Sequence, residues 1–162
     1  MAKSKTPASP WRNRIVGYGE AVTAEIVESS RNWRLHPAEQ TDALAGVLTD
    51  VGLVQNIVIN QRAGEQWPEA ERGRPVLVDG HARVALALHE GQAVLPATYV
   101  ELTPGEEAEI LATLDPVAAL AQADREKLAG LLGTVQSGNA AVQEMLSQLA
   151  EREGVVPKDE PI

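Results

Sequence analysis

The hydrophobic pattern of the first hundred residues changes its period several times, which predicts short strands separated by helices. Apolar runs that are too short for a helix favour strands at 14–18, 57–59, 76–78 and 95–102. The first of these is expected at a sheet edge, and a short apolar-bearing segment, 22–27, follows it. A polar excursion at 61–75, long for a hairpin loop, separates the second strand from the third.

Apolar residues at helical spacing predict two helices between these strands. The first follows Pro37 and ends before Gly52, and its apolar stripe consists of Leu44, Val47, Leu48 and Val51. The second begins near His81 and is closed by Gly91. The loop at 29–36, rich in side-chain donors, precedes the first helix. Two interpretations are open: an ordinary connection that Trp33 pins to the core, or a functional loop.

Three further helices are expected after the last strand. A capping box at 103–106 with Pro104 at the first position starts a helix that runs to about Leu114, where Asp115-Pro116 interrupts it. Asp124 and Asn139 cap the other two helices, whose stripes are Leu128, Leu131, Leu132 and Val135, then Val142, Met145, Leu146 and Leu149. These narrow stripes leave three partners open: each other, a second copy in a homodimer, or a downstream domain.

The order of elements predicts an α+β fold, with a small mixed sheet followed by C-terminal helices. We expect a disordered leader at 1–11, the sheet domain at 12–116, a helical extension at 117–153, and a tail or linker at 154–162. A ligand would lie at the strand ends of such a sheet.

Composition removes several classes of function. The chain has no cysteine, which excludes disulfides, thiolate metal sites and cysteine nucleophiles. Its three histidines show no metal-ligand spacing, so no metal ligand is assigned. No apolar run approaches the roughly 18 residues of a membrane span, and no secretion signal is recognisable. A cytoplasmic protein without a membrane partner is therefore expected.

Charge is distributed unevenly along the chain. The net charge of −9 argues against a surface that coats nucleic acid. Residues 1–36 nevertheless hold six Lys and Arg against three Glu. If DNA is contacted directly, the expected contact is this basic arm, with Lys3, Lys5, Arg12 and Arg14; the alternative is a solvated tail.

The clearest chemical signal is a strand that turns directly into a helix at Asp79-Gly80. A helix that begins at a strand end presents free N–H groups there, and these suit a phosphate. Gly80 lets the backbone approach such an anion, and His81 and Arg83 fall in the first helical turn. The alternative is a plain helix start with a glycine turn and two solvated polar residues.

Three blocks of this sequence, in this order, resemble the ParB/sulfiredoxin-like N-terminal domain: Asn-Trp-Arg-Leu-His-Pro at 32–37, Gly-Leu-Val-Gln-Asn-Ile-Val-Ile at 52–59 and Val-Asp-Gly-His-Ala-Arg at 78–83. The resemblance covers about residues 12–132 and implies a nucleotide pocket. It implies phosphate binding at the turn at 79–80. Residues 54–56, which directly precede the strand at 57–59 and are called the strand mouth, and the 29–36 loop would lie beside the phosphates. The implied site residues are Asp79, Gly80, His81, Arg83, Val54, Gln55, Asn56, Asn32 and Arg34.

The turn departs from the better-known branches of this family. Chromosome-partition ParB proteins have Gly-Glu-Arg-Arg there and bind CTP, whereas this chain has His81 and Ala82 at the second and third positions. Sulfiredoxins place a catalytic Cys where His81 stands, so sulfiredoxin activity is excluded. Free-serine kinases carry Asp-Gly-His-His-Arg, the closest spelling, and need a carboxylate base such as Glu25 or Glu28. No catalytic residue is assigned, and the implied ligand is CTP, ATP or ADP, with or without Mg²⁺.

ParB-like domains of phages and mobile elements, often fused to or encoded beside DNA methyltransferases, resemble the chain further, at 102–107 and 112–116 and in the helix after Asp124. The end at 155–157 resembles the junction to a methylase, and the chain contains no methylase motif of its own. The resemblance implies a nucleotide-binding module accessory to DNA modification, with a DNA methyltransferase as partner. The alternatives are a serine-type kinase or weak nucleotide hydrolase, and an interaction scaffold with a vestigial pocket.

Overall fold

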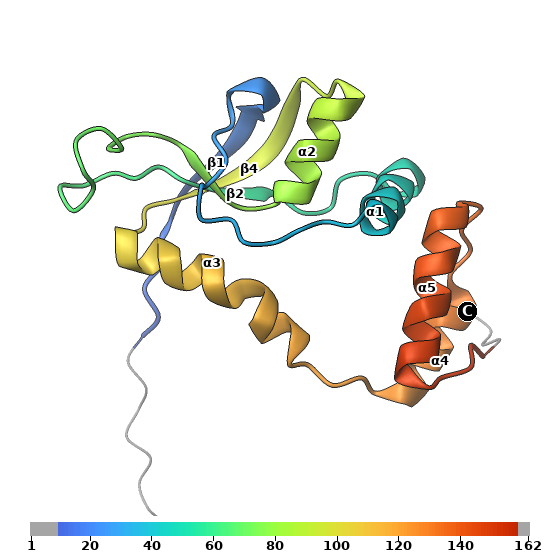
Figure 1. The fold of residues 1–162 in the computed structure, drawn as a ribbon. Helices are drawn as coiled ribbons and strands as arrows, with labels where there is room; N and C mark the ends of the chain where they lie inside the picture. Colours follow the sequence, from blue (N-terminus) through green and yellow to red (C-terminus); the bar gives the residue numbers. More distant parts are fainter. Residues whose placement is uncertain (1–9, 159–162) are drawn as a thin grey trace, which may run out of the picture.

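The computed structural model describes residues 10–158 of the chain. Within that part, four strands form one mixed sheet and helices lie on both of its faces (Figure 1). The elements are β1 (Ile15–Val22), η1 (Thr23–Glu25), α1 (Ala38–Asp50), β2 (Ile57–Asn60), β3 (Val76–Asp79), α2 (His81–Glu90), β4 (Val94–Val100), α3 (Pro104–Ala119), α4 (Arg125–Thr134) and α5 (Ala140–Glu153).

The strands lie in the order β1-β4-β2-β3, so β1 and β3 form the edges of the sheet. β4 pairs antiparallel with β1 and parallel with β2, and β3 pairs antiparallel with β2. A parallel pair needs a crossover connection, which β3 and α2 supply between β2 and β4. The predicted α+β fold with a small mixed sheet is confirmed.

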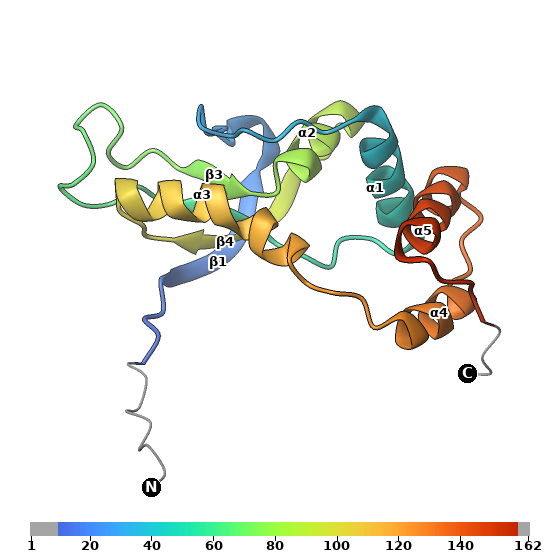
Figure 2. The same cartoon turned by 60° about the horizontal axis from the view of Figure 1, so that its bottom comes forward.

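Helix α2 covers one face of the sheet and α3 lies across the other, while α1, α4 and α5 pack at one end (Figures 1 and 2). The core between the sheet and α2 is aliphatic, because the chain has no Phe and few other aromatic residues. It consists of Ala21, Ile57, Ile59, Leu77, Val84, Ala87, Leu95 and Ala97.

The strand-turn-helix at the centre of the sequence forms as predicted. β3 ends at Asp79, Gly80 adopts a left-handed φ of +102°, and α2 begins at His81. Gly91, at φ +74°, ends α2. The predicted caps are also confirmed: Thr103 and Glu106 form both bonds of the capping box, and Asp124 and Asn139 accept backbone N–H bonds at the starts of α4 and α5.

Two elements extend beyond their predicted ends. β1 continues to Val22, since every residue from Gly17 onward pairs with β4. α3 continues through Pro116 to Ala119, so the predicted interruption at Asp115-Pro116 is wrong. Proline removes one backbone donor from a helix, and this part of α3 is exposed, so water can bind the freed carbonyl. The predicted domain boundary after residue 116 falls inside α3, and the division into domains stays a prediction.

Helices α1 and α4 bury smaller residues than their stripes predict, whereas α5 buries Val142 of its predicted stripe together with Ala150. The buried positions of α1 are Ala43 and Gly46, and those of α4 are Ala129 and Gly130. Members of the predicted stripes are exposed instead, among them Val51, Leu131, Val135 and Met145. The prediction of which residues form these interfaces is therefore wrong in part.

Close helix packing explains this preference for small residues. A Cβ atom on Gly46 of α1 would lie 2.6 Å from the side chain of Val142 at the start of α5. α5 packs on both α1 and α4, which confirms that the C-terminal helices pack on each other. Association with a second copy or a downstream domain stays a prediction.

Contrary to the ordinary-connection interpretation, Trp33 does not pin its loop to the core. Its side chain is largely exposed, and its Nε1 donates a hydrogen bond to the Leu111 carbonyl at 2.9 Å. The 29–36 loop is therefore fastened to α3. None of the helices described between residues 10 and 158 has the length and apolar character that crossing a membrane requires.

Candidate functional site

The turn between β3 and α2 is shaped by Gly80. Its φ of +102° is costly for other residues, and an added Cβ would lie 2.7 Å from Cγ2 of Ile57. No side chain of residues 10–158 caps the first turn of α2, so its N–H groups point to the surroundings of the turn. The predicted helix N-terminus at a strand end is thus present.

The turn from β3 into α2 and its immediate surroundings are called the corner. Arg83 lies there and is bound by other groups of the protein. Its Nη1 donates to the carbonyls of Gln55 at 2.7 Å and Asn56 at 3.3 Å, and its Nη2 lies 3.3 Å from Oδ2 of Asp79. These contacts fasten the strand mouth before β2 to the first turn of α2. The alternative interpretation of a solvated Arg83 is wrong, because its side chain is only 12% exposed.

Arg34 reaches the same corner from the 29–36 loop. Its Nη1 donates to Oδ2 of Asp115 on α3 at 2.6 Å and lies 4.0 Å from Oδ1 of Asp79. Its Nε and Nη2 are buried and find no hydrogen-bond partner within residues 10–158. Asp79 therefore lies between the guanidinium groups of Arg34 and Arg83, and Arg34 keeps one edge of its guanidinium free of protein acceptors in this part of the chain.

His81 is buried, which the solvated alternative does not predict. The residue is 5% exposed, and neither ring nitrogen has a partner in the described part of the chain. Burial lowers the pKa of His81, and so does the nearby charge of Arg34. The charges of Glu28 and Asp79 oppose this shift in part, and His36 adds to it. The imidazole is consequently neutral at pH 7.

The other predicted residues surround this corner without forming one closed site. Asn32 lies in the same loop as Arg34, and its Oδ1 accepts the backbone N–H of Arg34 at 3.4 Å. The Asn56 amide donates to Thr98 Oγ1 at 3.1 Å. The remaining two, Val54 and Gln55, are exposed at the strand mouth.

A groove with mixed polar and apolar walls adjoins the corner on the Arg83 side. It has a volume of about 460 Å³ and opens between α1 and α2. Its walls include Leu48, Leu53 and Leu86, with Arg83 as the member shared with the predicted site. Among residues 10–158, no group of three or more His, Asp or Glu could hold a metal ion.

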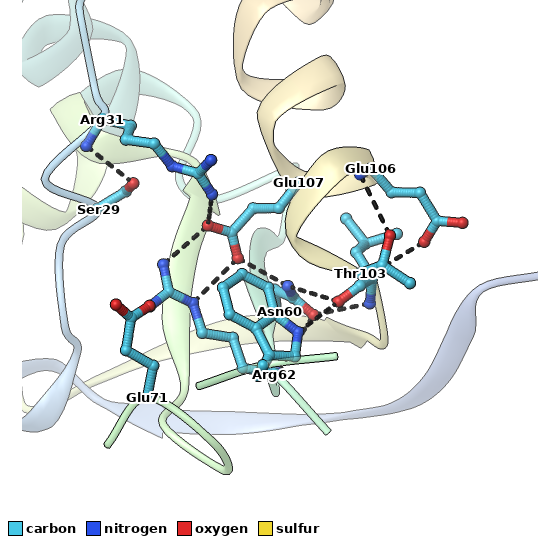
Figure 3. Close-up of polar contacts among 10 residues, drawn as sticks. Ser29, Arg31, Asn60, Arg62, Glu71, Thr103, Glu106 and Glu107 are labelled. Carbon is cyan, nitrogen blue, oxygen red and sulfur yellow. Dashed lines mark hydrogen bonds and ion pairs between the residues drawn. The ribbon is translucent and has the colours of Figure 1, made fainter. Parts of the chain in front are cut away.

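The sequence analysis missed a second polar site, centred on Glu107 of α3 (Figure 3). Glu107 is fully buried and accepts hydrogen bonds from Arg62 at 2.8 and 3.1 Å, from Asn60 at 2.7 Å and from Arg31 at 2.8 Å. Burial by itself raises the pKa of this carboxyl, but the bonds from Arg62, Asn60 and Arg31 outweigh it and lower the pKa. Glu107 is therefore ionised in the interior.

Arg62 is the buried one of the two arginines at this site. Its third nitrogen, Nη1, donates to Glu71 at 2.8 Å, and its guanidinium lies 4.4 Å from the ring centre of Trp67. Its backbone has a φ of +48°, a left-handed conformation that costs about 1–2 kcal/mol outside glycine. The sequence offers one weak signal for this site, a second glutamate directly after the capping-box Glu106.

The predicted DNA arm is only partly described. Lys3 and Lys5 lie outside the described residues. Arg14 donates to Glu106 Oε1 at 2.7 Å, and Arg12 lies 3.5 Å from the same oxygen. The hydrogen bond from Arg14 is the largest cause that lowers the pKa of Glu106 to about 2. Arg14 thus has a structural partner, and direct DNA contact by this arm stays a prediction.

Comparison with known proteins gives similarity in structure. No protein-family profile and no curated protein matches the chain. A structure of the C-terminally truncated chromosome-partitioning protein ParB from Caulobacter crescentus complexed with CTP-γ-S has a TM-score of 0.56 at 18% identity, over 87% of this chain and 73% of that chain.

Two further solved structures are less similar. ParB from Caulobacter crescentus complexed to the centromeric parS site has a TM-score of 0.43 at 15% identity, over 83% of this chain and 57% of that chain. A Pnob8-like ParB-N domain has a TM-score of 0.46 at 13% identity, over 85% of this chain and 48% of that chain. The first of the three matches establishes the architecture: the chain has a ParB-like fold.

Proposed function

We propose that this chain binds a nucleotide, with the phosphates at the corner where β3 passes into α2. The observation that carries the proposal is a set of buried side-chain nitrogens without protein partners there. Nε and Nη2 of Arg34 and both ring nitrogens of His81 lack a partner among residues 10–158. Both Arg34 nitrogens are donors, and one nitrogen of the neutral imidazole is a donor. A buried donor left unsatisfied costs about 1–3 kcal/mol, and a phosphate oxygen would relieve that cost.

The backbone supports the same ligand. The uncapped start of α2 presents N–H groups and the positive end of the helix dipole to an anion. A phosphate that binds these N–H groups must come close to the backbone, and Gly80 permits this because it has no side chain. The exposed strand mouth, with Gln55 and Asn56, would then contact the ribose or base.

The ParB-like fold supports CTP as the first nucleotide to test, since the similar Caulobacter crescentus structure is a CTP-γ-S complex. His81 and Ala82 replace Glu and Arg of the partition-protein motif, so ATP and ADP belong in the same experiment. We extend the proposal to a DNA transaction, accessory to DNA modification with a methyltransferase partner. This extension rests on the motif resemblance at 102–116 and after Asp124.

Isothermal titration of the full chain with CTP, ATP and ADP in Mg²⁺ tests the proposal. We expect binding by the wild type and at least about a tenfold loss for Arg34→Gln. Arg74→Gln is the matched control, since Arg74 is exposed and lies outside the corner. Absence of binding by the wild type, or equal binding by Arg34→Gln, would remove the nucleotide proposal.

One observation favours a second candidate, a small-molecule kinase or nucleotide hydrolase. Glu28 acts on the pKa of His81, so its carboxylate lies near the corner and is a candidate base. Two products of ATP or CTP, measured with and without serine, separate the two activities. A kinase moves the terminal phosphoryl group to the serine hydroxyl, whose proton passes to Glu28, and yields phosphoserine and the shortened nucleotide only when serine is present; Glu28→Gln should lose this product. A hydrolase releases inorganic phosphate without serine, and formation of neither product by the wild type contradicts this candidate.

A further inference from the structure

The 29–36 loop is held along one face of α3 at three successive helical turns. The positions on α3 are 107, 111 and 115, which are four residues apart and therefore lie on one face. The contacts are Arg31 Nη2 to Glu107 Oε1 at 2.8 Å, Trp33 Nε1 to the Leu111 carbonyl at 2.9 Å, and Arg34 Nη1 to Asp115 Oδ2 at 2.6 Å.

The last of these contacts fixes the direction of the Arg34 guanidinium. A guanidinium binds an oxyanion best through two parallel N–H bonds from one edge. Asp115 accepts the hydrogen bond from Nη1, so the Nε–Nη2 edge remains for an oxyanion. This edge is buried and has no partner among the described residues. The second acceptor near Nη1, Oδ1 of Asp79, lies farther away, at 4.0 Å.

We propose that Asp115 is a positioning residue, which orients Arg34 so that its Nε–Nη2 edge faces a phosphate oxygen beside His81. This inference rests on the proposed nucleotide function. Without the Asp115 carboxylate, Arg34 turns toward Asp79, and the edge that receives the oxyanion turns with it. The ligand then has to order a long side chain that the wild type holds in place, which costs affinity.

A second effect of Asp115 acts in the opposite direction, because its charge repels a bound phosphate. The Asp115 side chain is 53% exposed, so water and salt screen that repulsion. Its hydrogen bond to Arg34, by contrast, has a short and direct geometry. The orientation of Arg34 by Asp115 should therefore outweigh the repulsion between Asp115 and the phosphate. Removing the Asp115 carboxylate is expected to lower nucleotide affinity.

Titration of the full chain with CTP, ATP and ADP in Mg²⁺ tests this role. We expect Asp115→Asn to weaken binding about tenfold, equivalent to about 1.4 kcal/mol, and Asp115→Glu to recover part of the loss. Glu109→Gln changes an exposed carboxylate of the same helix that makes no side-chain hydrogen bond or ion pair among residues 10–158, and it is expected to bind like the wild type. The Asp115 side chain is 53% exposed, and Asp79 remains near Arg34 when the Asp115 carboxylate is removed. The thermal midpoints of Asp115→Asn and wild type should therefore agree within about 2 °C.

A spectroscopic measurement separates positioning from a general loss of structure. The NMR signal of the Arg34 Nε–H group, assigned by its loss in Arg34→Lys, should shift when nucleotide binds the wild type. At saturating nucleotide the shift should be smaller in Asp115→Asn. Equal or tighter binding by Asp115→Asn overturns the inference alone, whereas a wild type that binds no nucleotide overturns it together with the proposed function.

Discussion

Two largely buried arginines that bind carboxylates of α3 differ in how their donors are used. Each of the three nitrogens of Arg62 donates to a carboxylate, two of them to Glu107 and one to Glu71. Arg34 donates through Nη1 alone, and its Nε and Nη2 find no acceptor in the part of the chain that the structure describes. A buried polar cluster whose members are all paired specifies structure, while buried polar atoms without protein partners are positions where ordered water, an ion or a ligand can bind.

The two regions are connected through the 29–36 loop. Arg31 at one end of the loop joins the Glu107 cluster, and Arg34 near the other end lies at the corner beside His81. The cluster around Glu107 thus helps to form the corner between β3 and α2. It holds the 29–36 loop on α3 through Arg31, and the loop places Arg34 at the corner. Variants in the cluster should therefore change stability, and variants at the corner should change ligand binding.

The largest expected effect is that of Glu107→Ala. It leaves Arg62 buried without its main counter-charge, and breaking a buried ion pair costs about 3–5 kcal/mol of unfolding free energy. Urea denaturation followed by circular dichroism measures the loss. Glu109→Ala, on the exposed side of α3, should change the unfolding free energy by less than about 0.5 kcal/mol. A loss below about 1 kcal/mol for Glu107→Ala would mean that the cluster is not the structural site described.

His81→Leu should behave in the opposite way. An apolar side chain of similar size removes two ring nitrogens that lack partners among residues 10–158, so the unfolding free energy should stay within about 1 kcal/mol of wild type or rise. Nucleotide binding should weaken in the same variant. His89→Leu, at an exposed position, is the control for both measurements. A large destabilisation by His81→Leu would show that His81 has a structural partner.

Loss of the capping box at the start of α3 should lower the unfolding free energy by less than loss of Glu107 does. Thr103 caps the helix whose first turn carries Glu106 and Glu107, and its loss should cost about 1 kcal/mol in Thr103→Ala. Urea denaturation again measures it. Thr113 is an exposed residue in the middle of the same helix, where alanine is favourable. Thr113→Ala should therefore not lower the unfolding free energy. Equal unfolding free energies for the two variants would contradict the capping role.

The smallest effect is a pH dependence of stability from His81. Its pKa is lowered in the folded state, mainly by burial, so the unfolded chain binds the proton more readily. Stability should therefore fall as the pH drops below the ordinary histidine pKa of about 6.5. The lowered pKa values of Glu106 and Glu107 act only below about pH 4.5, the ordinary range of a glutamate.

Denaturation midpoints between pH 7.5 and 5 measure this slope. His81→Leu should show a shallower decline than the wild type over the same range, whereas His89→Leu should follow the wild type. Parallel curves for wild type and His81→Leu would contradict a buried, neutral His81.

Local chemistry made several features of this protein predictable. The turn at Asp79-Gly80, the capping box at Thr103 and the strand at 57–59 depend on residues that are neighbours in the chain. Their conformational preferences act over a few residues, so a sequence pattern is sufficient to place them. The order of these elements also determined the α+β architecture.

Only the tertiary structure decided which polar residues meet and which are buried. Glu107 contacts Arg62 across 45 positions of sequence and Arg31 across 76, and Arg34 contacts Asp115 across 81. No period or short motif encodes such pairs, because they arise from the packing of α3 against the sheet and the 29–36 loop. The burial of His81 and the small residues between α1 and α5 have the same origin: side-chain surroundings depend on distant segments, while backbone conformation depends largely on near ones.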